Sequence, residues 1–101
     1  MHFTHEAAPD GSVMSLYGSF TFRDHGSFRV LLDLLKASPG RRHVLDVSGI
    51  EFLDSAAIGM LLIAEEEARS GGWALVLRKP SSLVARLFEL AALDTLFTIE
   101  A

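Results

Sequence analysis

Apolar and polar positions repeat with two different periods along the chain, and the change of period divides it into strands and helices. Residues 2–7 and 12–18 alternate weakly around the turn signal "APDGS", which predicts a β-hairpin. In the next segment apolar residues recur at helical spacing after a capping Asp24 or Ser27, and the pattern stops at "SPG". We therefore expect the first helix between these limits.

The second half of the chain continues with strands and helices in turn. The run "RHVLDVSGI" lacks clean alternation, as is typical of a strand buried on both faces. After it we expect a helix over residues 55–70 ended by a glycine pair, a strand over 73–78, a helix that begins at "PSS", and a closing strand "LFTIE". The order β-β-α-β-α-β-α-β predicts one α/β domain over residues 1–101, with helices packed on a mixed, mostly parallel sheet of about five strands.

Composition narrows the classes of function. A net charge of −4 and a pI near 5.4 provide no basic stripe for a phosphate backbone, so we expect no direct nucleic-acid partner. The chain has no cysteine, which excludes disulfides and thiol catalysis. Neither a secretory leader nor an apolar stretch long enough for a membrane span is recognisable, so the sequence predicts a cytoplasmic protein without membrane insertion.

The segment "FLDSAAIG" contains a polar pair, Asp54 and Ser55, at the junction between a predicted buried strand and a predicted apolar helix. The simplest interpretation is that one of the two is the helix N-cap, whose side-chain oxygen accepts a backbone N–H for about 1 kcal/mol. In open α/β sheets the carboxyl ends of parallel strands also gather loops and helix N-termini, and ligands or partners bind there. Capping and binding are both compatible with the pair.

The helix that follows Ser55 has two apolar sides on a helical wheel. The side expected to face the sheet consists of Ala57, Ile58, Leu61, Leu62 and Ala68. The opposite side is made of small and apolar residues, namely Ala56, Gly59, Met60 and Ile63. A partner could dock on this second side, one turn from the Ser55 hydroxyl; alternatively, another layer of the same protein covers it.

A hydroxyl at a helix N-terminus can also carry a phosphate. The group adds about −1.5 to −2 charge and is favoured there by about 0.3–1 kcal/mol. A partner docked flat on the neighbouring apolar side would have to desolvate that charge, and without a matching cation it would dissociate. Such a switch needs no rearrangement of the domain.

The segment "VLDVSGIEFLDSAAIGMLL" resembles the signature of STAS domains, the anti-sigma factor antagonist family of bacteria. The segments "LYGSFTFRDHGSFRVLLDLL" and "GGWALVLRKPSSLVARLFELAALDTLF" resemble the family's first strand-helix unit and its later strand, helix and closing segment. The resemblance covers nearly the whole chain. It implies that Ser55 is the phosphoacceptor, that Asp54 is its neighbour at the helix start, and that Asp46 and Ser48 match the preceding strand end, with all four among the partner-binding residues.

The resemblance also implies partners and a function. Antagonists of this family bind a serine kinase that has a histidine-kinase-like ATPase domain and is itself the anti-sigma factor. Phosphorylation releases them, and a PP2C-type phosphatase reverses the modification. STAS-like domains also occur as non-enzymatic subunits of ABC-type lipid transport complexes, where the same helix docks on the ATPase. Both functions remain open from the sequence, and neither involves a cofactor.

Two features depart from the family pattern. Ala57 stands where family members usually have glycine, so the close approach that glycine allows is in question. The family usually adds a final helix after the strand that here ends near Ala101. Without that helix more of the sheet flank would be open, which predicts weak homodimerisation.

Other combinations of reactive residues point to no enzymatic chemistry. His2 and His5 are three residues apart and would lie on opposite faces of a strand, so a shared metal ion is not expected. No nucleophile-base set, phosphate-binding loop or Gly-x-Ser-x-Gly motif is identifiable, and we expect a binding module rather than an enzyme. Glu65 and Arg69 are spaced to form a surface ion pair on the helix.

Overall fold

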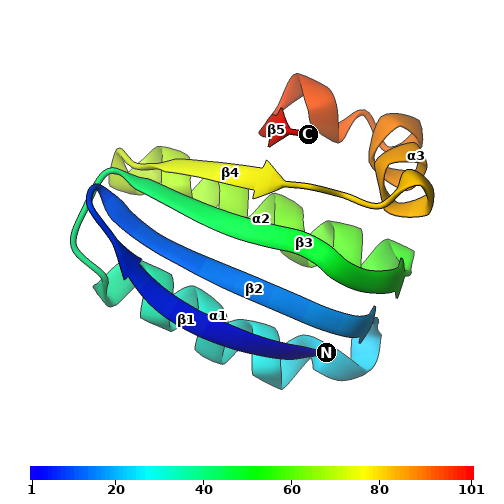
Figure 1. The fold of residues 1–101 in the computed structure, drawn as a ribbon, viewed down its shortest axis with the longest axis horizontal. Coiled ribbons are helices and arrows are strands. Elements are labelled where there is room, and N and C mark those ends of the chain that lie inside the picture. The colour runs from blue at the N-terminus through cyan, green and yellow to red at the C-terminus, as the bar shows by residue number, and fades with distance from the viewer.

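In the computed structural model, which describes residues 1–101, five strands form one mixed sheet and three α-helices pack on it (Figure 1). The strands are β1 (His2–Ala8), β2 (Gly11–Phe20), β3 (Arg42–Leu53), β4 (Ala74–Arg78) and β5 (Thr98–Glu100). The helices are α1 (His25–Ala37), α2 (Ser55–Gly71) and α3 (Ser82–Leu90), with short 3-10 helices η1 (Phe22–Asp24) and η2 (Leu93–Thr95). The predicted fold class and the predicted order of strands and α-helices are confirmed.

The strands lie side by side in chain order, β1 to β5, and only β1 and β2 run antiparallel. Each β-α-β connection therefore steps to the next strand in the same direction, and right-handed crossovers then place every helix on one face. Figure 1 shows α1 and α2 behind the sheet, and α3 near the end of β4. The carboxyl ends of β2 and β3, and the loops after them, meet at one edge of the sheet.

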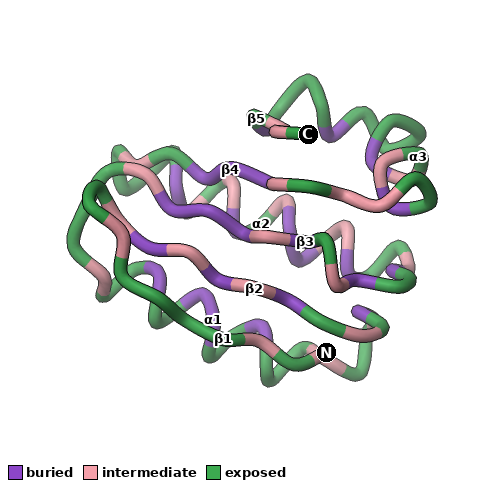
Figure 2. Tube along the Cα trace, viewed as in Figure 1, coloured by how far each residue is buried: buried purple, intermediate pink, exposed green.

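The core lies between the sheet and the helices as one cluster of 22 buried residues. Inward-facing residues of β2 and β3, such as Met14 and Leu45, meet the apolar stripe of α1, and the spacing predicted for that helix is confirmed by its buried residues Phe28, Leu31, Leu32 and Leu35. Figure 2 shows buried segments along the central strands, whereas β1 is mostly exposed. Hydrophobic burial on one face of the sheet thus fixes where each helix lies.

The face of the sheet without helices is protected by long charged side chains. Val44 and Val76 point away from the core cluster and are nevertheless almost fully buried. Arg42 on β3 pairs with Glu100 on β5, so its side chain has to cross β4 and the valines beneath. Arg78 binds the same carboxylate at 3.2 Å, and this hydrogen bond lowers the pKa of Glu100. The network attaches the short β5 to the centre of the sheet.

No helix of the structure is both long enough and apolar enough to cross a lipid bilayer. The longest helix, α2, spans 17 residues and becomes charged in its second half. The ion pair expected there is present, with 3.5 Å between Arg69 and Glu65. The helix then ends at Gly72 in the left-handed conformation, at the predicted glycine pair.

A buried imidazole lies at the end of the sheet opposite the β2 and β3 carboxyl ends. His43 is 1% exposed; its Nδ1 lies 2.7 Å from the Ser12 hydroxyl, and its ring meets the edge of Trp73. Burial lowers the pKa of His43, and the opposing influences of the Gly40 backbone and of the Asp10 carboxylate are smaller. The imidazole is therefore held neutral in the fold.

Because the pKa of His43 is lowered in the native protein, the unfolded chain binds more protons at this group than the native protein as the pH falls below the ordinary histidine pKa of 6.5. We expect the free energy of unfolding to be insensitive to this group above pH 6.5 and to fall below it, by up to about 1.4 kcal/mol per pH unit. Denaturant melts of the wild type and of His43→Phe between pH 5 and 7.5 measure the difference. An NMR titration in which the His43 ring protonates at or above pH 6.5 would contradict this account.

Candidate functional site

Asp54 connects β3 to α2 and is the N-cap of that helix. Its backbone is extended, with φ −99° and ψ 179°, and its Oδ1 accepts the Ala57 N–H at 2.9 Å. This is the N-cap geometry of an Asp at a strand-to-helix junction. Of the two capping residues that the sequence left open, the structure selects Asp54.

The second carboxylate oxygen of Asp54 reaches a different part of the chain. Its Oδ2 accepts the Phe22 N–H at 3.1 Å, and the Asp54 N–H donates to the Phe20 carbonyl at 3.3 Å. One side chain thereby joins the loop after β2 to the start of α2. Nothing in the sequence signalled this bond, because its partners are 32 residues apart.

Ser55 is the first residue of α2, its side chain is exposed, and its hydroxyl makes no hydrogen bond within the protein. The backbone N–H groups of Ser55 and Ala56 have no acceptor within the helix, since the first turn of any helix lacks them. A free hydroxyl therefore stands beside unpaired donors at the positive end of the helix dipole. An added phosphate would find favourable electrostatics there.

Three of the four residues predicted on the outer side of α2 lie at the surface and form a patch, which we call the α2 patch: Ala56 and Ile63 are exposed, and Gly59 between them is partly exposed. Ile63 is 52% exposed, a large aliphatic side chain left in water. A Cβ added at Gly59 would meet no atom within 4 Å. The alternative prediction, that another layer of the same protein covers this side, is wrong for these three residues, because none of them is buried.

The fourth residue, Met60, was placed on the wrong side by the helical wheel. It is 4% exposed and belongs to the core cluster together with Ala57, Leu61 and Ala64. The physical reason is that α1 packs beside α2, so the buried stripe of α2 is turned toward α1 as well as toward the sheet. Ile58 and Leu62, predicted to face the sheet, are only partly buried.

Asp46 and Ser48 lie away from Ser55. The strand that contains them does not end there but continues to Leu53, through two register irregularities against β2. Because Leu45 and Val47 point into the core, the two polar residues lie on the face without helices. Ser48 donates its N–H and its hydroxyl to Asp46 Oδ1, at 3.0 and 2.7 Å, so the pair satisfies itself within the strand. The prediction that they mark the strand end is wrong.

Ala57 answers one question that the sequence raised. Its side chain is completely buried and faces the core. Its methyl group therefore adds packing beneath α2 and occupies no room on the outer surface. Alanine in place of the family glycine leaves the exposed side of the first turn unchanged.

Sequence reasoning missed an aromatic residue next to Asp54. Phe22 in η1 is 63% exposed, and the Arg23 guanidinium lies 5.8 Å from the centre of its ring. Aromatic side chains, phenylalanine included, and arginine are enriched at protein interfaces relative to the rest of the surface. No pattern in the sequence distinguishes Phe22 from its buried neighbour Phe20.

The chain matches known proteins over nearly its whole length. A family model described as "Mlab, STAS domain" matches residues 3–99. A STAS-domain containing protein from Pseudomonas aeruginosa (strain UCBPP-PA14) is 30% identical over an alignment of 101 positions, which covers 98% of this chain and 99% of that protein.

Solved structures share the fold at lower identity. A Thermotoga maritima protein described as a candidate anti-sigma factor antagonist has a TM-score of 0.85 at 19% identity, over 98% of this chain and 86% of that one. The anti-sigma factor antagonist SpoIIAA in its unphosphorylated form has a TM-score of 0.75 at 18% identity, over 99% and 89% of the two chains. Phosphorylated SpoIIAA from Bacillus gives 0.73 at 16%, over 99% and 92%. Because the family model spans almost every residue and the fold agrees, this chain belongs to the STAS domain family.

Proposed function

We propose that this protein is an anti-sigma factor antagonist that works by partner switching. Its unphosphorylated form binds a serine kinase that has a histidine-kinase-like ATPase domain and acts as the anti-sigma factor. Phosphorylation of Ser55 by that kinase releases the complex, and a PP2C-type phosphatase restores the binding form. The protein itself is a binding module and no enzyme.

One observation carries this proposal: the residue that caps α2 is not the residue that presents the exposed hydroxyl. Asp54 supplies the cap, and Ser55 makes no hydrogen bond that a phosphate would break. Modification of Ser55 therefore leaves the helix start intact. The similar TM-scores to SpoIIAA with and without phosphate are compatible with a switch that does not change the fold.

The α2 patch explains how a phosphate would prevent binding. Ala56 and Gly59 follow Ser55 within about one helical turn, and their small side chains leave the backbone open to close approach by a partner. A dianionic group at the edge of this surface would be desolvated on docking, at a cost of several kcal/mol if no cation meets it. The switch thus acts by charge at the interface.

A second function is favoured by the family model, whose description names Mlab and not an antagonist. STAS-like domains also serve ABC-type lipid transport complexes, and the α2 patch would then dock on the transporter ATPase. In that case the Ser55 hydroxyl contributes contact area and never needs a phosphate. The Ser55→Ala variant separates the two functions. An antagonist would lose its phosphorylation switch in this variant, whereas a transport subunit would keep its transport activity.

The separation of cap from hydroxyl predicts unequal effects on stability. Asp54→Ala removes the cap and the bond to Phe22, so we expect a loss of about 1–3 kcal/mol in the free energy of unfolding. Ser55→Ala should change it by less than about 0.5 kcal/mol. Ser81→Ala, which removes the cap of α3 alone, is the matched control for a single lost bond. Equal effects of the Asp54 and Ser55 variants in urea denaturation would refute the assignment.

Incubation with the cognate kinase and ATP should add one phosphate to the protein, and Ser55→Ala should abolish it. Intact-mass measurement followed by peptide mapping locates the group. Ser55→Glu should fold normally yet bind the kinase at least tenfold more weakly by titration calorimetry, because the new charge lies at the docking edge. Phosphate found on another residue, or unchanged affinity of the Glu variant, would argue against the proposed site.

Gly59→Ala should raise stability and weaken binding at the same time. Alanine in a helix interior is favoured over glycine by about 0.5–1 kcal/mol, and the added Cβ meets no atom of this protein. The same methyl would stand on the α2 patch in the way of the partner. Ser70→Ala, at the exposed far end of α2, is the control that should leave binding unchanged. Stabilisation without any loss of affinity would show that the partner does not approach Gly59.

A further inference from the structure

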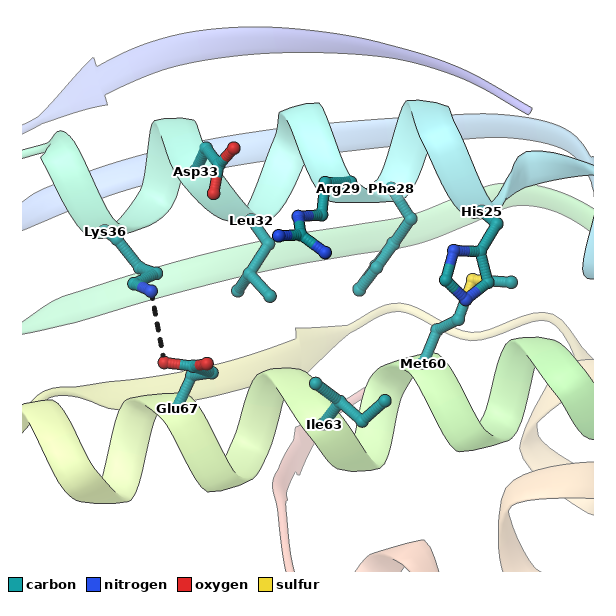
Figure 3. Close-up of a pocket in the computed structure, with 9 residues that line it drawn as sticks. All are labelled: His25, Phe28, Arg29, Leu32, Asp33, Lys36, Met60, Ile63 and Glu67. Atoms are coloured by element: carbon teal, nitrogen blue, oxygen red, sulfur yellow. Dashed lines mark ion pairs between the residues drawn. The ribbon is translucent and has the colours of Figure 1, made fainter.

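A groove runs between α1 and α2, on the side of the helices away from the sheet, and encloses a cavity of about 180 Å³ (Figure 3). Its base is formed by Phe28, Leu32 and Met60, which belong to the core cluster. On the α2 side the wall is Ile63, the exposed member of the α2 patch. The groove is therefore an apolar slot in contact with water.

The size of the cavity indicates what fits. Pockets for small-molecule ligands usually measure about 300–1,000 Å³. A volume of about 180 Å³ suits one or two aliphatic side chains of a protein partner instead. Apolar anchors inserted between two helices are the mode by which an amphipathic helix is recognised.

The charges around the groove select among such helices. Lys36 and Glu67 form an ion pair of 3.3 Å that bridges α1 and α2 at one end. Arg29 forms no ion pair in the protein, and Figure 3 shows its guanidinium directed into the space between the helices. Asp33, one turn further along α1, also lines the groove, but it forms no ion pair with Arg29. A carboxylate is the group that Arg29 lacks.

The groove also continues the α2 patch. Ile63 is at once the wall of the groove and the last residue of the stripe that starts at Ala56, beside Ser55. A helix lying along this stripe would pass from the phosphoacceptor to the groove without leaving α2. One partner segment can thus reach both.

We propose that the partner contacts this protein through an amphipathic helix that inserts aliphatic side chains into the α1–α2 groove and places a carboxylate against Arg29. This inference rests on the proposed function, which it extends by naming the partner's binding segment. Arg29 is then a specificity-determining residue on α1, distant in sequence from Ser55.

The probe is a capped, alanine-rich helical peptide that carries two leucines one turn apart and a glutamate one turn further on. A matched peptide has glutamine in place of the glutamate. Both are titrated into the ¹⁵N-labelled wild-type protein and into Arg29→Gln, and the chemical shifts of α1 and α2 give the site and the affinity. Arg41→Gln, an exposed arginine at the far end of the sheet, is the control.

The expected result is binding in the groove, about two- to fivefold tighter for the glutamate peptide than for the glutamine peptide. That preference should disappear in Arg29→Gln and persist in Arg41→Gln. Equal affinities on the wild type, shifts that map outside the groove, or no shifts at the solubility limit of the peptide would each overturn the proposal. So would a wild-type dimer in sedimentation that Ile63→Ser dissociates, because a second copy would then be the occupant.

This experiment is independent of the Ser55 switch, since no kinase is present in the titration and the protein stays unphosphorylated. If the peptides fail to bind while the kinase still modifies Ser55, only the groove proposal falls. If the peptides show the Arg29-dependent preference and no phosphate is ever added to Ser55, the groove stands and the antagonist function falls.

Discussion

The bidentate use of the Asp54 carboxylate is the constraint on which the site depends. One oxygen holds the first turn of α2 through the Ala57 N–H, and the other holds the loop after β2 through the Phe22 N–H. The two loops at the carboxyl edge of the sheet are therefore joined into one corner by a single side chain. Because Asp54 caps the helix, the neighbouring Ser55 hydroxyl is not needed as a cap. It is exposed at the first residue of α2 and remains available for modification.

The topology of the sheet determines which elements lie next to the start of α2. With the strands in chain order, α1 and α2 pack on the same face, so α2 has α1 beside it and solvent over its outer side. The outer side presents Ala56, Gly59 and Ile63, which no part of the chain covers. The opposite face of the sheet is protected in another way, by arginines that share the Glu100 carboxylate. The α2 patch is thus the helix surface that a protein partner can contact.

The periodicity of the sequence predicted every strand and every α-helix, because local apolar patterns fix each element and the order of elements fixes the crossovers. It failed where the answer lay in contacts between distant segments. Met60 was predicted to face solvent because a helical wheel of α2 contains no information on α1, which packs beside it and buries this side chain. The resemblance placed Asp46 and Ser48 at a strand end, whereas β3 continues to Leu53 through two irregularities in its register with β2, which have no local signal. The bond from Asp54 to Phe22 has no local signal at all.

The central claim is that a phosphate on Ser55 blocks a partner by charge and leaves the fold unchanged. The most direct measurement compares ¹⁵N spectra of the domain before and after Ser55 phosphorylation, each titrated with the ATPase partner. We expect shifts confined to the first turn of α2 and its neighbours in η1, together with loss of partner binding. Binding that survives phosphorylation, or shifts spread through the sheet, would contradict it.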